Sequence, residues 1–274
     1  MGRLDVALAD IAYEVAPATV RQIFYQAVVR GLVPKSETTG YRVVQRRLLK
    51  LREDETIPYG LITDNARMVR TRARWGSPEH FAREAAARYR RDYWADSEVR
   101  VEVWLEKDAL AGVLSPTVVD ECGLDLYVTR GFASVTYLQE AAEFVRDDGR
   151  PTFVYVLTDF DPSGLSIAET VERELVARSW PTEVTVERLA VHREQIDIYG
   201  LPTRPTKTTD ARARKFEREH GTGSVELDAI PPDVLRGLVK ASVERHMDDR
   251  KLSLLKLAER REREGLRSLF GGAS

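Results

Sequence analysis

The sequence contains very little cysteine and no long apolar segment. Its 274 residues include a single cysteine, Cys122, so neither an intramolecular disulfide nor a cysteine-based zinc cluster can form. No apolar run approaches the roughly 18 residues that a membrane-spanning helix needs. The first ten residues, MGRLDVALAD, carry acidic side chains where a signal segment would be apolar. A disulfide-stapled secreted scaffold is thereby excluded, and we expect a cytoplasmic protein with no membrane association.

Charge is nearly balanced over the whole chain but not along it. The 42 Lys and Arg and the 44 Asp and Glu give a net charge of −2, which excludes a uniformly basic protein. Residues 1–95 hold 17 basic and 11 acidic side chains, a balance of +6, whereas residues 96–274 hold 25 and 33, a balance of −8. We therefore predict two domains, 1–95 and 96–274, which the chain length allows. A basic domain attracts phosphate backbones, and an acidic one that handles a polyanion needs cations, so DNA plus a divalent metal is indicated; ordinary surface variation is the alternative.

The segment after Pro17-Ala18-Thr19 has the periodicity of a helix with one buried face. Gly31 supplies a stop just beyond it. Tyr25 projects away from the apolar positions, and Arg21 precedes it by one helical turn. We therefore predict a phenol and a guanidinium on one exposed edge. The apolar stripe consists of Val20, Ile23, Phe24, Ala27 and Val28.

A second helix is predicted over residues 40–51, with one packing face and one cationic face. Residues 57–63 have the pattern of a hairpin or wing. This order predicts a winged helix-turn-helix, whose second helix enters the major groove of DNA. A small helical domain with solvated arginines is the alternative. The packing positions are Tyr41, Val44, Leu48 and Leu51; the DNA-binding candidates are Arg42, Arg46, Arg47 and Lys50; Arg67, Arg70, Arg72 and Arg74 add charge beyond the wing.

From residue 99 the pattern changes to strands that alternate with helices. Strands are predicted over 99–105, 124–128, 152–157 and 184–189, and helices over 134–145 and 165–176. The order βαβαβαβ predicts a parallel sheet covered by helices, followed by a helical C-terminal extension. The fold class is therefore α/β, with the winged-helix domain first and a Rossmann-like parallel-sheet domain second.

Acidic residues follow two of these strands. Glu106 comes after the first strand, and Asp159 and Asp161 come after the third. In a parallel sheet the reactive residues collect at the carboxyl ends of the strands, so the three carboxylates are expected to converge. Converging carboxylates repel one another unless a hard cation joins them, which indicates a Mg²⁺ or Mn²⁺ site. The alternative for Asp161 is a helix cap, with Pro162 at the first helical position.

These residues resemble two modules of one protein superfamily. Glu106 after one strand and Asp159-x-Asp161 after another resemble a Toprim domain, the metal-binding module of topoisomerases, primases and some nucleases. The stretch Val20 to Tyr25 is similar to the catalytic-tyrosine helix in the A subunit of topoisomerase VI and in its meiotic double-strand-break relatives. Residues 225–232, VELDAIPP, are similar to a late glutamate-containing motif of that superfamily. The resemblance covers about residues 17–245.

The resemblance implies a type IIB topoisomerase A-subunit-like enzyme that makes metal-dependent double-strand breaks in DNA. Tyr25 would attack a backbone phosphate and form a 5′-phosphotyrosyl link, with Arg21 stabilising the developing charge. In this superfamily a homodimer brings the tyrosine of one subunit to the metal site of the other. The chain is short for a full A subunit and has no Gly-rich ATP-binding motif, so we expect a reduced bacterial or mobile-element form, associated with the nucleoid, with a possible separate ATPase subunit.

Two alternatives remain open at this point. The protein is a Toprim nuclease that uses water in place of Tyr25, or it is a DNA-binding subunit that no longer cuts. Tyr25 with Arg21 favours transesterification over the first alternative. The intact set of Glu106, Asp159 and Asp161 argues against the second.

Overall fold

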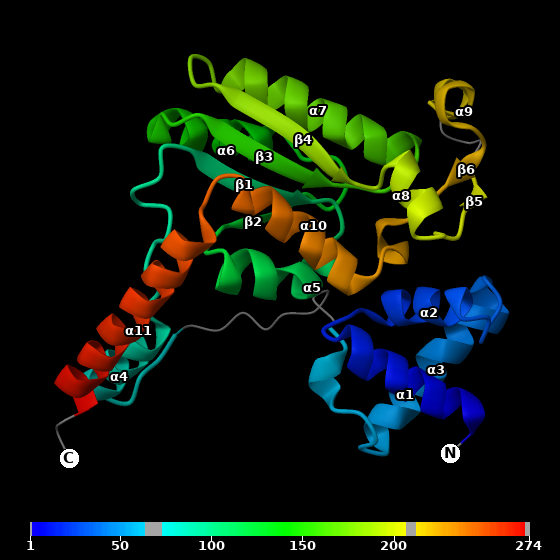
Figure 1. The fold of residues 1–274 in the computed structure, drawn as a ribbon, viewed down its shortest axis with the longest axis horizontal. Helices are drawn as coiled ribbons and strands as arrows, with labels where there is room; N and C mark the ends of the chain where they lie inside the picture. The colour runs from blue at the N-terminus through cyan, green and yellow to red at the C-terminus, as the bar shows by residue number, and fades with distance from the viewer. Residues whose placement is uncertain (1, 64–72, 207–211, 272–274) are drawn as a thin grey trace.

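The structure is a computed structural model that describes residues 2–63, 73–206 and 212–271. It is a mixed α/β structure with a four-stranded parallel sheet and a group of N-terminal helices (Figure 1). The α/β class and the parallel sheet predicted above are confirmed. The division after residue 95 stays a prediction.

Three helices form the N-terminal group: α1 (Arg3–Val15), α2 (Val20–Val29) and α3 (Arg42–Glu53). At the start of α2, the Thr19 hydroxyl accepts a hydrogen bond from the Gln22 amide, and the Gln22 side chain accepts one from the Thr19 amide. This reciprocal cap fixes the first turn of α2, and Gly31 follows its end in a left-handed conformation, with φ of 67°. A π-turn over Glu37–Tyr41 leads directly into α3. Both predicted helices are confirmed, and α1 is an element that the sequence analysis did not identify.

The segment predicted as a wing has a different structure. Residues Tyr59–Leu61 form a 3₁₀ turn, and Ile62 pairs with Ala18 in an isolated parallel bridge. Pro58 lacks an amide hydrogen, and the partner of Ile62 is the segment before α2. No hairpin therefore forms within residues 57–63, and that prediction was wrong. Arg74 is exposed, while Arg67, Arg70 and Arg72 lie outside the described residues.

All four predicted strands are present in one parallel sheet. They are β1 (Arg100–Leu105), β2 (Leu126–Val128), β3 (Thr152–Leu157) and β4 (Val184–Ala190), in the order β2-β1-β3-β4. In the register, Leu105 at the end of β1 is level with Leu157 at the end of β3 and with Val128 at the end of β2. The carboxyl ends of the two central strands therefore meet at one edge of the sheet.

Helices cover both faces of this sheet (Figure 1). On one face, α6 (Val135–Asp148) and α7 (Pro162–Arg178) enclose an apolar cluster around Trp104, Val154 and Val156. On the other face lie α5 (Ala111–Ser115) and α10 (Pro232–Glu244). The apolar cluster on that second face continues into the N-terminal helices, so α2 and α3 pack against the same core as the sheet.

The remaining elements lie at the two ends of the sheet. A short hairpin of β5 (Arg204–Pro205) and β6 (Gly223–Ser224) stands above α2, followed by the 3₁₀ turn η5 (Leu227–Ala229) (Figure 1). At the opposite end, α4 (Pro78–Arg88) runs along the C-terminal helix α11 (Asp249–Gly271). Two further helices are α8 (Arg193–Ile198), which follows β4, and α9 (Ala213–His220), which lies between β5 and β6 in the chain. Among the helices that the structure describes, none is long and apolar enough to cross a membrane.

Candidate active site

The acidic residues meet at the carboxyl ends of β1 and β3. Glu106 directly follows β1, and its amide donates to the carbonyl of Leu157 at the end of β3, at 3.0 Å. The Glu106 carboxylate in turn accepts a hydrogen bond from the amide of Asp159, also at 3.0 Å. The adjacency of β1 and β3 thus places the two carboxylates side by side, as the strand order requires.

Asp161 has two sets of contacts. Its Oδ1 accepts a hydrogen bond from the Gly164 amide at 2.8 Å, and Pro162 occupies the first position of α7, so Asp161 is the cap of this helix. Its Oδ2 lies 3.6 Å from the guanidinium of Arg204. The turn needs glycine at position 164, because a Cβ there would lie 2.2 Å from the carbonyl oxygen of Asp159. The capping role of Asp161 and its place near the other acids therefore coexist.

Lys107 lies at the centre of this group. Its ammonium is 2.6 Å from Asp228 Oδ2, 2.9 Å from Asp159 Oδ1 and 3.8 Å from Glu226 Oε2. Burial alone would lower the pKa of Lys107, but the three carboxylates raise it well above its usual range. Lys107 is therefore a permanent internal cation. The sequence analysis missed both Lys107 and Asp228, although Lys107 directly follows Glu106.

Glu226 connects the acids to the N-terminal helices. The backbone of Val225 pairs with that of Phe160, at 2.8 and 2.9 Å, which brings Glu226 next to the segment of Asp159 and Asp161. Its carboxylate accepts a hydrogen bond from Arg204 and lies 3.4 Å from the Arg21 guanidinium. Burial alone would raise the pKa of Glu226, but Lys107, Arg204 and Arg21 together lower it. We call Glu106, Lys107, Asp159, Asp161, Arg204, Glu226 and Asp228 the charged cluster.

Tyr25 is buried, with 3% of its surface exposed, so the predicted exposed edge was wrong. Residues 202–203 and Glu226 lie over this face of α2. Lys35 connects this segment to Tyr25. Its ammonium lies 5.6 Å from the centre of the Tyr25 ring and donates hydrogen bonds to the carbonyls of Pro202 and Thr203. Helical periodicity identifies one packed stripe on α2 but does not reveal that a second surface covers the opposite side.

Tyr25 and Arg21 contact the charged cluster within one chain. The Tyr25 hydroxyl lies beside the Glu226 carboxylate, which also pairs with Arg21. Burial and the negative charge of Glu226 raise the pKa of Tyr25 to about 12, and Arg21 opposes this shift. Tyr25 therefore lies beside the acids of its own chain, whereas the resemblance implies that the tyrosine of one subunit meets the metal site of the other. The homodimer stays a proposal.

The carboxylates suit a divalent cation that arrives with a phosphate. Among the described residues no three Asp, Glu, His or Cys side chains form a ready metal site. One oxygen of Glu106 and one of Asp159 are fixed by backbone amides, while the second oxygen of each makes no hydrogen bond or ion pair in the part of the chain that the structure describes. Mg²⁺ is commonly held by one or two carboxylates together with substrate phosphates. Glu106 and Asp159, with Asp161 beside them, fit that mode of binding.

The pKa of Glu106 gives a pH-dependent stability. Burial and Asp159 raise this pKa from 4.5 to about 7, so the folded protein binds the proton more tightly than the unfolded chain. Stability contributed by protonated Glu106 is present at pH 5 and is lost as the pH rises through 7. In metal-free buffer, Glu106→Gln should therefore be more favourable to stability at pH 8 than at pH 5. The difference between its effects on the free energy of unfolding at the two pH values should be about 1–3 kcal/mol.

Urea unfolding at both pH values measures this difference. Glu98→Gln, at an exposed position just before β1, is the control and should change stability equally at pH 5 and pH 8. An equal effect of Glu106→Gln at the two pH values would show that burial and Asp159 do not raise the pKa of Glu106.

Three of the four predicted DNA-binding residues form an exposed row on α3. Arg42, Arg46 and Lys50 are exposed and lie four residues apart, on one side of the helix; we call them the basic row. Arg47 lies elsewhere and pairs with Asp5 of α1 at 3.1 Å. Of the four predicted packing positions, Val44, Leu48 and Leu51 are buried and Tyr41 is half-buried. Arg47 is also exposed, and this ion pair ties α3 to α1.

Replacing two residues of the basic row with alanine should weaken DNA binding and its dependence on salt. Each lost phosphate contact lowers the slope of log affinity against log salt by about one unit. The test variant is Arg42→Ala with Arg46→Ala, measured by fluorescence anisotropy at several salt concentrations. Arg47→Ala is the matched control and should leave the slope unchanged. An unchanged slope in the double variant would place the DNA surface elsewhere.

Comparison with known proteins finds no family model that matches this sequence and no curated protein that is similar to it. The function is therefore argued from the charged cluster, from Tyr25 and Arg21, and from the motifs that carry the resemblance.

Proposed function

We propose that this protein cleaves double-stranded DNA by tyrosine transesterification, as a type IIB topoisomerase A-subunit-like enzyme. In this proposal, α1 to α3 serve as a helix-turn-helix DNA-binding domain without the predicted wing, and the parallel sheet serves as a Toprim domain. One observation carries it: Tyr25 and Arg21 both contact Glu226, in the same cluster that holds Lys107 and Asp159. A candidate nucleophile, two cations and a group of acids thus lie together.

The residues of the site have complementary roles in this reaction. The Tyr25 oxygen attacks a backbone phosphorus and the bond to the 3′ oxygen breaks, which leaves a 5′-phosphotyrosyl link and a free 3′-hydroxyl. A phenol with a pKa of about 12 is protonated at neutral pH, so its proton must be accepted during the attack. Glu226 is the carboxylate in contact with that hydroxyl. Arg21 and Lys107 are placed to stabilise negative charge on the phosphate oxygens.

A divalent cation completes the proposal. Glu106, Asp159 and Asp161 would hold Mg²⁺ or Mn²⁺, which when bound neutralises phosphate oxygens and favours departure of the 3′ oxygen. The acids also exclude a phosphate that arrives without a cation, because their negative charges repel it.

A second candidate is a Toprim nuclease in which water is the nucleophile. The burial of Tyr25 favours this candidate, because an attacking group that is 3% exposed must first be uncovered from Lys35 and the loop that it holds. The acids and the DNA-binding surface have the same roles in both candidates. The two differ only in which oxygen becomes bonded to phosphorus.

The proposed partners follow from the same function. Double-stranded DNA is the substrate, a homodimer places two cuts symmetrically on a duplex, and an ATPase subunit would be a separate protein. Association with the nucleoid would follow from DNA binding.

Trapping a covalent adduct tests the proposed function. The full chain is incubated with radiolabelled duplex DNA and Mg²⁺ or Mn²⁺, and the reaction is stopped with detergent. Transesterification yields protein attached to 5′ ends, whereas the second candidate yields cut DNA with free 5′ ends. Intact DNA under all metal conditions, with and without a crude extract that supplies a partner subunit, would contradict both.

A further inference from the structure

A cavity of about 360 Å³ lies beside the charged cluster, between α2, α3 and the turn that follows β1. Its size is within the range of about 300–1,000 Å³ typical of small-molecule sites. The N-terminal helices contribute Arg21, Tyr41, Gln45, Leu49 and Arg52 to its wall, and Asp228 of the charged cluster forms part of the opposite side. The cavity therefore shares Arg21 and Asp228 with the proposed active site.

The wall combines cations, an amide and apolar surface. The Arg21 guanidinium lies 4.7 Å from the centre of the Tyr41 ring, and Leu49 leaves 45% of its surface exposed. Arg52 also lines this wall, and its guanidinium lies 5.3 Å from the centre of the Tyr59 ring. Phosphate oxygens are the acceptors that a guanidinium binds best.

The neighbours of the cavity connect it to both parts of the proposed function. Arg21 pairs with Glu226, which contacts Tyr25, and Asp228 pairs with Lys107. On α3, Gln45 and Leu49 each precede by one residue a member of the basic row, Arg46 and Lys50. Successive residues of a helix point about 100° apart, so the cavity and the basic row lie on neighbouring sides of α3.

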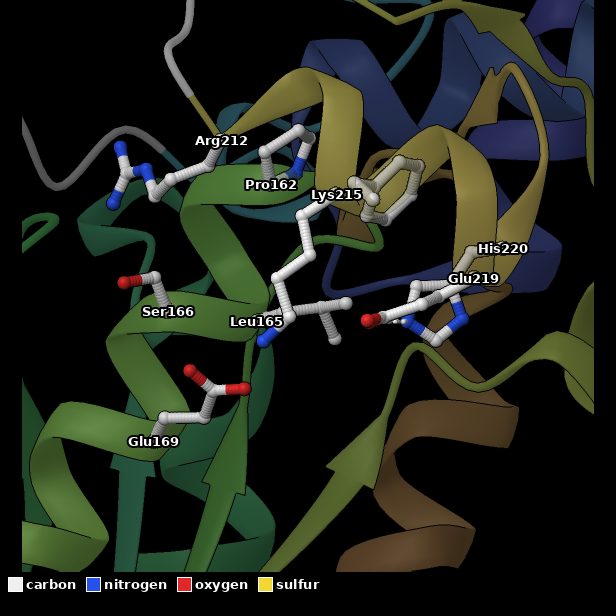
Figure 2. Close-up of a pocket in the computed structure, with 9 residues that line it drawn as sticks. Pro162, Leu165, Ser166, Glu169, Arg212, Lys215, Glu219 and His220 are labelled. Carbon is white, nitrogen blue, oxygen red and sulfur yellow. Dashed lines mark ion pairs between the residues drawn. The ribbon is translucent and has the colours of Figure 1, made fainter.

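A second cavity, between α7 and α9, does not have these properties (Figure 2). It holds only about 90 Å³, and its wall combines Arg212 and Lys215 with the carboxylates Glu169 and Glu219. The size and charge of this second cavity suit neither a phosphate nor a base.

We propose that the larger cavity binds one nucleotide, with its phosphate on Arg21 and Arg52 and its base against Tyr41 and Leu49, within reach of the Gln45 amide. In DNA this would be a nucleotide drawn out of the stack next to the cleaved bond, and this part rests on the proposed function. A free nucleotide has the same chemistry. Base contacts with aromatic and arginine planes do not require a particular sequence, so the site would position the strand without selecting it.

Two variants on α3 separate this cavity from the basic row. Arg52→Met removes a guanidinium from the cavity and keeps the side-chain stem, while Arg46→Met makes the same change on the basic row. Both are made in Tyr25→Phe protein and measured in EDTA, so that cleavage plays no part in the result. The probes are dAMP, titrated by calorimetry, and duplexes with 2-aminopurine at successive positions, whose fluorescence rises when that base leaves the stack.

We expect dAMP to bind, and Arg52→Met to weaken its binding by at least about tenfold while Arg46→Met changes it by less than about twofold. We also expect one 2-aminopurine position to brighten on binding, and Arg52→Met to abolish this signal. Binding of dAMP with no fluorescence change at any position would support the nucleotide site and assign it to a free nucleotide. No dAMP binding and no fluorescence change would overturn the proposal, even if covalent adducts form with DNA. Conversely, a nucleotide signal without any cleavage activity would contradict the proposed function alone.

Discussion

Asp159→Asn and Asp161→Asn should each abolish metal-dependent DNA cleavage and leave DNA binding in place. Asp159 has one of the two carboxylate oxygens that make no hydrogen bond or ion pair among the described residues and can therefore bind a cation. Asp161 lies beside it on the same turn. An amide keeps the shape and the acceptor oxygen of the side chain but removes the charge that holds a hard cation. Because such an ion supplies several kcal/mol of charge stabilisation, the loss in rate should be at least about a thousandfold.

The measurement is cleavage of linear DNA with Mg²⁺ or Mn²⁺, beside binding in EDTA. Asp108→Asn is the matched control: it also lies after β1, but its carboxylate pairs with Arg130, outside the charged cluster. Thermal unfolding shows whether each variant is folded, which matters for Asp159 because it loses its ion pair with Lys107. Cleavage by the wild-type protein that persists in EDTA would refute the assignment of a metal to these acids.

The strands and the acids after them could be predicted from the sequence because both depend on local pattern. Alternating apolar residues such as Val101, Val103 and Leu105 identify a strand, and the rule that parallel strands end at one edge places Glu106 near Asp159. The capping role of Asp161 was foreseen as an alternative, and the structure shows it beside a contact with Arg204. Local signals were sufficient for this half of the candidate site.

The rest of the site depends on contacts between segments far apart in the chain. Lys107 is followed along the chain by Asp108, yet it pairs with Asp228, 121 residues away, and its role follows from that distant carboxylate. Tyr25 was assigned to an exposed edge because helical periodicity does not show that residues 202–203 and Glu226 cover it. The 3₁₀ turn in place of a wing has the same cause, since Ile62 pairs with Ala18, more than forty residues earlier.

Removing the Tyr25 hydroxyl should change the stability of the protein very little. The same Glu226 carboxylate that contacts the hydroxyl is held by Lys107, Arg204 and Arg21, so its charge remains balanced if the hydroxyl is lost. A phenylalanine at this position keeps the ring and its contacts with Phe24 and Lys35. The free energy of unfolding should therefore fall by only about 1 kcal/mol, the usual net contribution of one hydrogen bond.

Tyr25→Phe should bind DNA and form no covalent adduct, because the oxygen that attacks phosphorus is gone. Tyr93→Phe is the matched control: Tyr93 is also buried, and its hydroxyl donates to the Glu259 carboxylate at 2.8 Å, far from the charged cluster. This control should lose similar stability and keep full adduct formation. Detergent-quenched reactions with labelled DNA measure both variants against the wild-type protein. If Tyr25→Phe still cuts DNA and leaves free 5′ ends, water is the nucleophile, and the acids and the basic row keep the roles assigned to them while Tyr25 becomes a structural residue that contacts Glu226.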